Sequence, residues 1–355
     1  MTAHTAVTLC IVNHNGAEHL ERLFRALSHQ AWLFAEVLLI DNASSDSSLA
    51  VTQRLCPQAR IIRLPENNGP GAARNAGFRQ AANDLILFQD NDILIGVDTT
   101  ERLVRHLLEF SDALLAAPRV VYADDPTIVQ YDSADCHFLG LMAPRNANQP
   151  VETLESNPCR TTSMVSACFL INRAHWSGED LFDESFGFNL EDHDFGVRAC
   201  LAGHALWIQP QAVVEHGSGT PGLSYRPGFT ASDQRLYCLT LNRWIVVTKC
   251  FAARTVVLLA PLLLLFECMQ FVWLARQGHT RIWLRATRAY WRERKRNYAM
   301  RQDIQRSRRV ADIEILRTMP LPLTGVVRRG TVSNALVNTA DRLMHLYWRL
   351  VRRWI

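Results

Sequence analysis

Short apolar runs alternate with amphipathic segments along the first 90 residues of the chain. Val7–Val12 is an almost unbroken apolar run and predicts a buried strand, whereas Glu18–Ser28 gathers its leucines and Phe24 on one face and predicts a helix. The same patterns predict strands at Val37–Ile40, Ile61–Leu64 and Leu85–Phe88, and a helix at Ala72–Ala82. Strands that alternate with helices favour an α/β fold, with a mostly parallel sheet flanked by helices.

The pattern changes further along the chain. Periodicity is lost over Tyr122–Cys159, which predicts an irregular excursion. A helix is predicted at Leu190–Gly203 and a short strand at Leu206–Ile208. Thr255–Ala275 is then almost wholly apolar, and Arg276–Arg309 is rich in arginine with interleaved tryptophan and tyrosine.

Charge is distributed as unevenly as hydropathy. From Arg276 onward there are 19 of the 38 Lys and Arg residues and only 5 of the 34 Asp and Glu residues. That part carries +14 and the preceding part −10, although the whole chain carries only +4. A basic segment of this kind needs a polyanionic partner or an anionic surface. We therefore predict two domains, an α/β domain over residues 1–240 and a helical, membrane-associated region over residues 241–355.

The cysteines and the N-terminal segment bear on the compartment. Nine cysteines without a CxxC pair predict reduced, buried thiols, as in cytosolic proteins. The first apolar run is short, and polar Asn13-His14-Asn15 follows it in place of a small-residue cleavage site. We therefore expect no secretory signal before the first strand.

Two carboxylates follow the predicted strand Leu85–Phe88. In extended backbone, residues two apart point the same way, so Asp90 and Asp92 can face one ion while Asn91 faces away. Paired carboxylate oxygens suit Mg²⁺ or Mn²⁺. A polar turn after a strand shows the same pattern, so the pair alone leaves both interpretations open.

A second acidic cluster, Glu191–Asp194, begins the helix predicted after residue 189. Asp192 shares a stripe with Phe195 and two alanines, whereas Glu191 and Asp194 fall on the polar side of the helix. A carboxylate that faces inward can have a raised pKa and act as a general base. Alternatively, the acidic first turn only complements the helix dipole.

Two further segments lie beside predicted strand ends. His216 precedes a glycine-rich turn and could be a third metal ligand, although a lone histidine in a loop is more often solvated. The loop Asn67–Asn75 is similar to a dinucleotide-binding loop, but it lacks the third glycine and follows the third strand, which excludes NAD. A glycine-rich turn that opens a helix can still bind phosphate, and Arg74 adds a positive charge.

In this order, the motifs resemble those of the family 2 glycosyltransferases, inverting enzymes with the GT-A fold. The matching stretches are Val7–Gly16, Ile40–Asp46, Asn67–Gly77, Asp90–Asp92, Phe188–Arg198 and Val214–His216. The resemblance covers the first domain and implies a GT-A-type sheet there. One departure is His14, because many members have a tyrosine before the asparagine at position 15, and the residue that stacks on the base is therefore open.

The resemblance also implies roles for single positions. It implies that Asp41 contacts a uracil or thymine ring, that Asp192 is the catalytic base, and that a divalent cation, Mn²⁺ or Mg²⁺, is bound. The implied metal ligands are Asp90, Asp92 and His216. The implied donor-binding residues are Asn13, Asn15, Asp41, Asn67, Gly69, Arg74 and Asp90.

The activity implied is inverting transfer of a sugar from a UDP- or dTDP-sugar to a hydroxyl of a carbohydrate or lipid-linked acceptor, in the synthesis of cell-surface polysaccharide or glycolipid. One alternative is a nucleotidyltransferase of similar fold, but a lysine-rich triphosphate loop is missing, since the lysines are Lys249 and Lys295. Another is a non-catalytic nucleotide-sugar-binding protein, against which the intact acidic residues argue. We expect no nucleic-acid partner.

The apolar segment Thr255–Ala275 is about long enough to cross a ~30 Å hydrocarbon core. A single crossing would separate the nucleotide-binding domain from the Arg-rich flank, although the positive-inside rule and the donor place both in the cytoplasm. Glu267 would also be costly in mid-bilayer. We therefore expect a helix in the interface, or a re-entrant hairpin broken near Pro261, on the cytoplasmic face of a membrane. The alternative is a buried helix pair.

Overall fold

The computed structural model describes residues 5–29, 32, 34–217, 232–321 and 331–355. In place of a single boundary near residue 240, contacts divide the chain into two units. The first unit consists of Met1–Ala134, Pro144–Phe195 and His204–Gly219. The second consists of Asp135–Ala143, Gly196–Gly203 and Thr220–Ile355, so two short segments from the middle of the sequence belong to the C-terminal unit.

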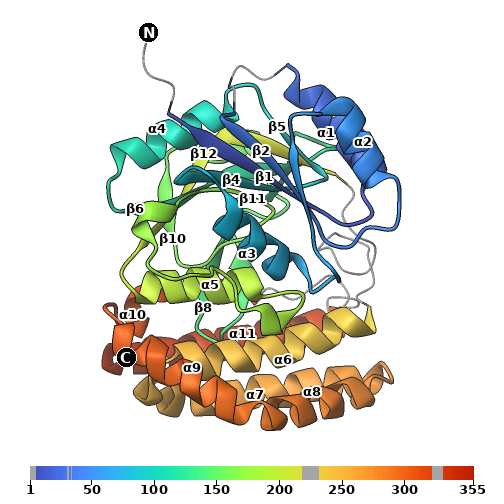
Figure 1. Ribbon diagram of the computed structural model, residues 1–355. Coiled ribbons are helices and arrows are strands. Elements are labelled where there is room, and N and C mark those ends of the chain that lie inside the picture. The colour runs from blue at the N-terminus through green and yellow to red at the C-terminus, as the bar shows by residue number, and fades with distance from the viewer. Residues whose placement is uncertain (1–4, 30–31, 33, 218–231, 322–330) are drawn as a thin grey trace. The chain divides into compact units, whose positions relative to one another are not determined.

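A ten-stranded sheet forms the centre of the first unit (Figure 1). Its main path runs β10-β12-β6-β11-β4-β1-β2-β3, with β5 beside β12 and β7 beside β6. The strands are β1 Val7–Asn13, β2 Glu36–Asp41, β3 Arg60–Arg63, β4 Leu85–Asp90, β5 Ile93–Ile95, β6 Ala113–Tyr122, β7 Val129–Tyr131, β10 Cys159–Thr161, β11 Cys168–Asn172 and β12 Ala205–His216. Strands β3, β2, β1 and β4 are mutually parallel, and β12 is parallel to β6, whereas β11 is antiparallel to both its neighbours. The predicted α/β fold is confirmed, and the sheet is mixed, because β5, β7, β10 and β11 pair antiparallel with their neighbours.

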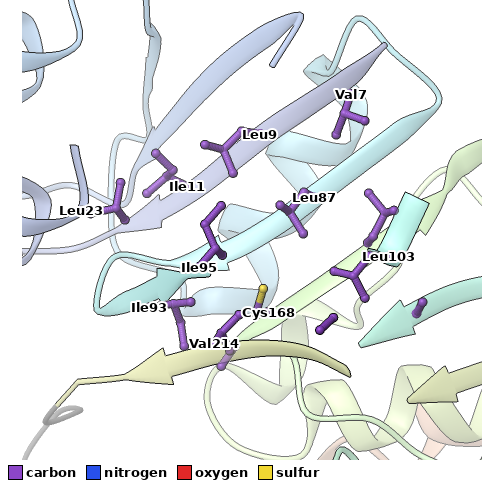
Figure 2. Packing of buried hydrophobic residues seen from close by; sticks show 14 of the residues in the cluster. Val7, Leu9, Ile11, Leu23, Leu87, Ile93, Ile95, Leu103, Cys168 and Val214 are labelled. Carbon is purple, nitrogen blue, oxygen red and sulfur yellow. The ribbon is translucent and has the colours of Figure 1, made fainter. Parts of the chain in front are cut away.

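Helices flank this sheet on both faces. They are α1 Ala17–Leu27, α2 Ser48–Leu55, α3 Pro70–Gln80 and α4 Thr99–Glu109, together with the first turn of α5, Glu191–Leu201. Leu9 and Ile11 of β1 belong to a core that also contains Leu23 of α1 and Leu103 of α4 (Figure 2). On the other face, a Cβ added to Gly77 of α3 would lie 2.3 Å from Cys10 Sγ. Alternate β1 residues therefore pack against different helical layers, as a period of two requires.

Two segments are more regular than their sequences predict. The range 122–159 contains β7, β8 Ala134–His137, β9 Met142–Pro144 and the 3₁₀ turn η1 Val151–Thr153, so the predicted irregular excursion is wrong in part. Strands of three or four residues are too short to display a period of two. Strand β12 continues to His216, well past the predicted end at Ile208, and its second half alternates between buried and exposed residues.

Helices make up most of the second unit. They are α6 Asp233–Cys250, α7 Ala253–Arg276, α8 Thr280–Arg292, α9 Arg294–Ser307, α10 Asp312–Ile315 and α11 Thr331–Val351, followed by the 3₁₀ turn η4 Arg352–Trp354. A small sheet joins β13, Leu316–Arg317, to β8 and β9. Helix α6 packs against α8 and α9, and α7 against α8 and α11. Helix α7 is continuous through Pro261, so the hairpin break predicted near this residue is not observed. Proline removes one backbone hydrogen bond, but packing on other helices can hold the helix together.

Candidate functional site

The carboxyl ends of three parallel strands meet at one edge of the sheet. Asn13 ends β1 and pairs in register with Asp41, which ends β2. On the other side of β1, Val12 pairs with Asp90 at the end of β4. The chain leaves β1 toward β2 and later returns on the other side to β4, so the strand order reverses here. Ligands of open α/β sheets bind outside such carboxyl ends.

A hydrogen-bonded network joins the loops after β1 and β2. Asn13 Nδ2 donates to Asp41 Oδ1 at 3.3 Å and to Ser44 Oγ at 3.1 Å. Ser44 N donates to Asp41 Oδ2 at 3.2 Å, and Asn15 N donates to Ser44 Oγ at 2.9 Å. The Asp41 carboxylate is buried, with Arg63 Nε 3.7 Å from Oδ2. Asp41 therefore holds both loops in place, while its predicted contact with a base stays a prediction.

The glycine-rich loop before α3 lies beside this network. Asn67 Oδ1 accepts hydrogen bonds from Asn42 Nδ2 at 2.8 Å and from Gly69 N at 3.1 Å. Gly69 has φ +90°, and an added Cβ would lie 1.7 Å from Gly187 O. Only glycine fits this backbone conformation and this close approach. Asn42 thus holds Asn67 and Gly69 at the β2 end, a role that we did not predict from the sequence.

Arg74 lies inside the protein, with 2% of its side chain exposed. Its Nη2 donates to Asp90 Oδ1 at 2.5 Å, and Nη1 lies 3.8 Å from Glu191 Oε1. Its Nε and Nη1 have no hydrogen-bond partner within the described part of the chain. The guanidinium therefore joins the two acidic clusters that the sequence predicts separately. Its contact with a donor phosphate stays a prediction.

Strand pairing brings His216 to the first acidic cluster. Strand β12 pairs with β5, which places His216 opposite Ile93, and Gly217 N donates to Asp92 O at 2.8 Å. His216 Nε2 lies 3.3 Å from Asp92 Oδ2, and Nδ1 lies 2.7 Å from Gln130 Oε1. If Nδ1–H donates to Gln130, Nε2 keeps its lone pair on the Asp92 side, as a metal ligand requires. The glycine-rich turn from residue 218 onward lies outside the described residues.

Asp92 and His216 fit a cation that is bound together with a diphosphate. Their adjacent oxygen and nitrogen atoms lie at a strand end and are largely shielded from solvent. Within the described residues, no group of three His, Cys, Asp or Glu side chains could enclose a metal by itself. Mg²⁺ in particular is commonly held by one or two carboxylates plus substrate phosphates.

The residue between the two aspartates faces another way. Asn91 Nδ2 donates to Asn13 Oδ1 at 2.7 Å, so its side chain belongs to the loop network after β1. Loss of solvation raises the pKa of Asp90 and the Asp92 charge raises it further, whereas Arg74 lowers it.

The whole first turn of α5 is buried. Asp192 is buried, as its stripe predicts, but Glu191 and Asp194 are buried as well, so their predicted place on a polar surface is wrong. Helical spacing shows which residues share a face, but it does not show whether other elements cover that face. Here Arg74 covers Glu191, while Ser163 Oγ lies 2.7 Å from His193 Nδ1.

Asp192 has the environment of a general base. Its Oδ1 accepts a hydrogen bond from His193 N at 2.8 Å, and its Oδ2 accepts one from Ser166 N at 3.2 Å. Burial raises the pKa of Asp192, and these N–H groups oppose the shift. Burial and repulsion by Asp192 raise the pKa of Glu191 to about 8. Burial therefore raises the pKa of both carboxyl groups, and the backbone N–H groups oppose that rise at Asp192.

Asn75 is a buried residue for which we predicted no role from the sequence. Its Oδ1 accepts from Leu181 N at 3.1 Å and from Phe182 N at 3.0 Å. Its Nδ2 donates to Phe182 O at 2.9 Å and to Glu184 Oε1 at 3.1 Å. Asn75 thus anchors on α3 the loop that precedes α5. Its place inside the Asn67–Gly77 motif was the available signal, whereas Ser166 and Gln130 lie in segments without a pattern.

Comparisons with known proteins agree with this geometry. Residues 8–176 match the family model described as Glycosyl transferase family 2. Over 99 residues the chain is 31% identical to the succinoglycan biosynthesis protein ExoO of Rhizobium meliloti, which covers 28% of each chain. Over 257 residues it is 26% identical to an N-acetylglucosaminyl-diphospho-decaprenol L-rhamnosyltransferase of Mycobacterium tuberculosis, covering 65% of this chain and 83% of the other.

A solved structure shares the fold. The crystal structure of GalNAc-T7 with UDP, GalNAc and Mn²⁺ aligns with a TM-score of 0.55 and 18% identity, over 72% of this chain and 49% of the other. The matched segment spans only 42% of an uncharacterized glycosyltransferase of Haemophilus influenzae and 28% of ExoO. These findings confirm the predicted glycosyltransferase domain.

Proposed function

We propose that this chain, whose residues 8–176 form a glycosyl transferase family 2 domain, is an inverting glycosyltransferase that uses a UDP- or dTDP-sugar and a divalent cation. One observation carries the proposal. Arg74 contacts Asp90 at the end of β4 and lies 3.8 Å from Glu191, the neighbour of the buried carboxylate Asp192. The Arg74 guanidinium therefore joins Asp90, a predicted metal ligand, to the acidic cluster that contains the predicted base Asp192.

The relatives support the class of acceptor. One is named for succinoglycan biosynthesis, and another for rhamnosyl transfer to an N-acetylglucosaminyl-diphospho-decaprenol. For this chain we propose a carbohydrate or lipid-linked acceptor in cell-surface polysaccharide or glycolipid synthesis. GalNAc-T7, crystallised with UDP and Mn²⁺, is in accord with a nucleotide-sugar donor and a cation at this type of fold.

The residues of the chain account for the chemistry as follows. Asp192 accepts the proton of the acceptor hydroxyl, whose oxygen forms a bond to the anomeric carbon of the donor sugar. The bond from that carbon to the diphosphate breaks, and its electron pair leaves with the nucleoside diphosphate. Attack from the face opposite the leaving group inverts the anomeric configuration. Asp92 and His216 would hold a divalent cation, which would supply Lewis-acid stabilisation of the departing charge.

Incubating the purified chain with a panel of nucleotide sugars tests the proposal. We expect release of UDP or dTDP from one donor, faster with an acceptor, and far less release by the Asp192→Asn variant. Release of pyrophosphate from nucleoside triphosphates would favour a nucleotidyltransferase. Tight binding of a nucleotide sugar without turnover under any condition would favour a non-catalytic binding protein.

We also propose that the protein works on the cytoplasmic face of a membrane. Within the described residues, α7 is the one helix long and apolar enough to cross a bilayer, with a mean hydropathy of 2.1 over its most apolar window. The +14 charge from Arg276 onward suits anionic lipids. Cell fractionation should find the chain with membranes, with both termini protected from protease added outside sealed cells. A C-terminus cut from outside would contradict this location.

A further inference from the structure

Helix α7 of the second unit has one buried face and one exposed face. Thr255, Leu259, Leu262, Phe266 and Leu274 are buried against other helices. On the opposite side, Val257 is 72% exposed and Leu264 66% exposed, and Phe271 continues the row one heptad further. This exposed row runs almost the length of a 24-residue helix. A soluble protein rarely leaves such a large apolar patch open to water unless it binds a partner or a membrane.

Two polar side chains of α7, Glu267 and Gln270, contact α6. Glu267 pairs with Arg243 of α6 and accepts a hydrogen bond from Trp244 Nε1 at 2.7 Å. Gln270 Nε2 donates to Thr240 Oγ1 at 2.9 Å. Helix α7 is therefore fixed on α6 by side chains that would be costly to place in hydrocarbon. Only its outer row is free of polar groups along most of its length, which suits a helix that lies on a bilayer better than one that crosses it.

Helix α8 adds positive charge beside this row. Arg281, Arg288 and Arg292 are exposed on this helix, whereas Arg285 lies over the Tyr237 ring of α6, with its Cζ 4.1 Å from the ring centroid. Exposed Trp291 and Leu284 stand between them, and the helix contains no acidic residue. Arginine with interleaved aromatic and apolar residues is typical of helices in the headgroup region of anionic membranes.

The exposed faces of α7 and α8 point in the same direction. Trp283 of α8 contacts Trp244 of α6 with ring centroids 6.0 Å apart, and it contacts Phe271 of α7 at 5.2 Å. Within the second unit, α7 and α8 form a layer on one side of α6 and α9 (Figure 1). Since both use their inner faces to cover α6, their exposed faces point away from it. We call the exposed residues of these two helices the α7–α8 face.

We propose that the α7–α8 face is a monotopic membrane-binding surface, which holds α7 in the plane of an anionic phospholipid bilayer. Val257, Leu264 and Phe271 are immersed at the boundary between headgroups and acyl chains, and the α8 arginines contact lipid phosphates. This inference deepens the proposed location at a membrane. It does not depend on the identity of the transferred sugar, and it can be tested without donor or acceptor.

The accessibility of a native cysteine shows whether the exposed row of Val257, Leu264 and Phe271 enters the membrane. Cys268 is exposed, one helical turn beyond Leu264, while Cys159 is exposed on β10 of the first unit. The full chain is treated with a water-soluble maleimide, alone and with vesicles of phosphatidylcholine and phosphatidylglycerol. We expect the vesicles to protect Cys268 while Cys159 continues to react. Equal labelling of Cys268 with and without vesicles, when the chain co-sediments with them, would overturn the proposal.

Vesicle sedimentation separates the apolar contribution to membrane binding from the electrostatic contribution. The double variants Val257→Gln/Leu264→Gln and Arg281→Gln/Arg288→Gln should each reduce binding about tenfold or more, the second only on vesicles that contain phosphatidylglycerol. The matched controls are Leu108→Gln, at a residue 62% exposed on α4, and Arg22→Gln on α1, which should bind as the native chain does. Unchanged binding by both double variants would contradict the assignment.

Labelling both ends of α7 distinguishes the in-plane helix from a crossing one. In Arg254→Cys and Arg276→Cys variants of the chain, an impermeant maleimide outside the vesicles should label both positions. Protection of one end alone would indicate a transmembrane helix. Donor hydrolysis in solution should be the same for the Val257→Gln/Leu264→Gln variant and the native chain. A failure to bind vesicles is thereby separated from a failure of glycosyl transfer.

Discussion

At the scale of single residues, two neighbouring buried carboxyl groups differ in their hydrogen-bond partners. Asp192 accepts two backbone hydrogen bonds, whereas Glu191 Oε2 has no hydrogen-bond partner within the described residues. Backbone N–H groups stabilise the ionised form of the first, and burial disfavours the ionised form of the second. The backbone N–H groups therefore favour the ionised form of Asp192, whereas burial and the Asp192 charge raise the pKa of Glu191 to about 8.

Asp192→Asn should lower turnover by about 10² to 10⁴, the range for loss of a general base. The substitution keeps the shape of the side chain, so the dissociation constant for the nucleotide should stay nearly unchanged. Steady-state kinetics and nucleotide titration measure the two quantities. If Asp192→Asn is active while Asp194→Asn is inactive yet folded, the base is the other carboxylate.

Glu191→Gln should change how stability depends on pH. The raised pKa of about 8 means that the folded state keeps a proton that the unfolded state releases near the ordinary value of 4.5. The stability of the native chain should therefore be highest below that ordinary value and fall as the pH rises through about 8. In the variant, the free energy of unfolding should no longer fall over this pH range. Urea unfolding at a series of pH values measures it. Parallel curves for the two proteins would contradict the assignment.

Metal affinity should depend on Gln130, which contacts His216, as well as on the predicted ligands themselves. Chelation should abolish transfer, and Mn²⁺ or Mg²⁺ should restore it. Asp92→Ala should be inactive but folded, since its carboxylate lies at a strand end. Gln130→Ala removes the group that orients His216 and should weaken metal affinity by about 10- to 100-fold. Full activity in excess chelator would contradict metal-assisted transfer.

At the scale of elements, the site depends on how one helix holds a loop. Helix α3 contributes Arg74 to the acidic clusters and, one residue later, Asn75 to the loop before α5. Glycines fix the helix itself, because Gly69 begins it beside Gly187 and Gly77 lets it approach β1. The Asn67–Gly77 motif therefore positions the loop before α5 as well as the glycine-rich loop.

Asn75→Ala should destabilise the first unit by about 2 to 4 kcal/mol, because two buried backbone N–H groups lose their acceptor. The loop before α5 should loosen, so turnover should fall more than nucleotide affinity does. Urea unfolding and kinetics measure the two effects. Asn68→Ala, at an exposed position of the same motif, is the control and should change neither.

At the scale of the whole molecule, the C-terminal unit is more than an appended anchor. It includes Asp135–Ala143 and Gly196–Gly203, which lie far from residue 240 in sequence. Phe138 stacks on Trp348 with ring centroids 5.0 Å apart, and Arg309 N donates to Leu201 O at 2.7 Å. These inner segments obtain their partners from helices that follow residue 240.

A fragment that consists of residues 1–240 should therefore not behave as an independent domain. Phe138 and the end of α5 would lose their packing, so we expect aggregation or a melting temperature well below that of the whole chain. Thermal unfolding of both proteins in the same detergent is the measurement. A fragment that melts cooperatively at the temperature of the whole chain would show that residue 240 is a true domain boundary.

The sequence by itself determined the strands, the helices and the candidate residues at the strand ends. Local periodicity records which side of an element is apolar, so Val7–Val12 and the alternation from Asp90 to Asp92 could be interpreted without any distant contact. The resemblance of the ordered motifs further implied that Asn67, Asp192 and His216 belong to one site.

Only the tertiary structure decided which of these groups meet and which are buried. Arg74 turns inward between Asp90 and Glu191, and His216 reaches Asp92 because β12 pairs with β5. Neither contact leaves a trace in local periodicity, since each joins residues far apart in the chain. The protonation of Glu191 follows from those neighbours, because the cost of ionising a carboxyl group depends on the solvent and charges around it and not on its place in the sequence.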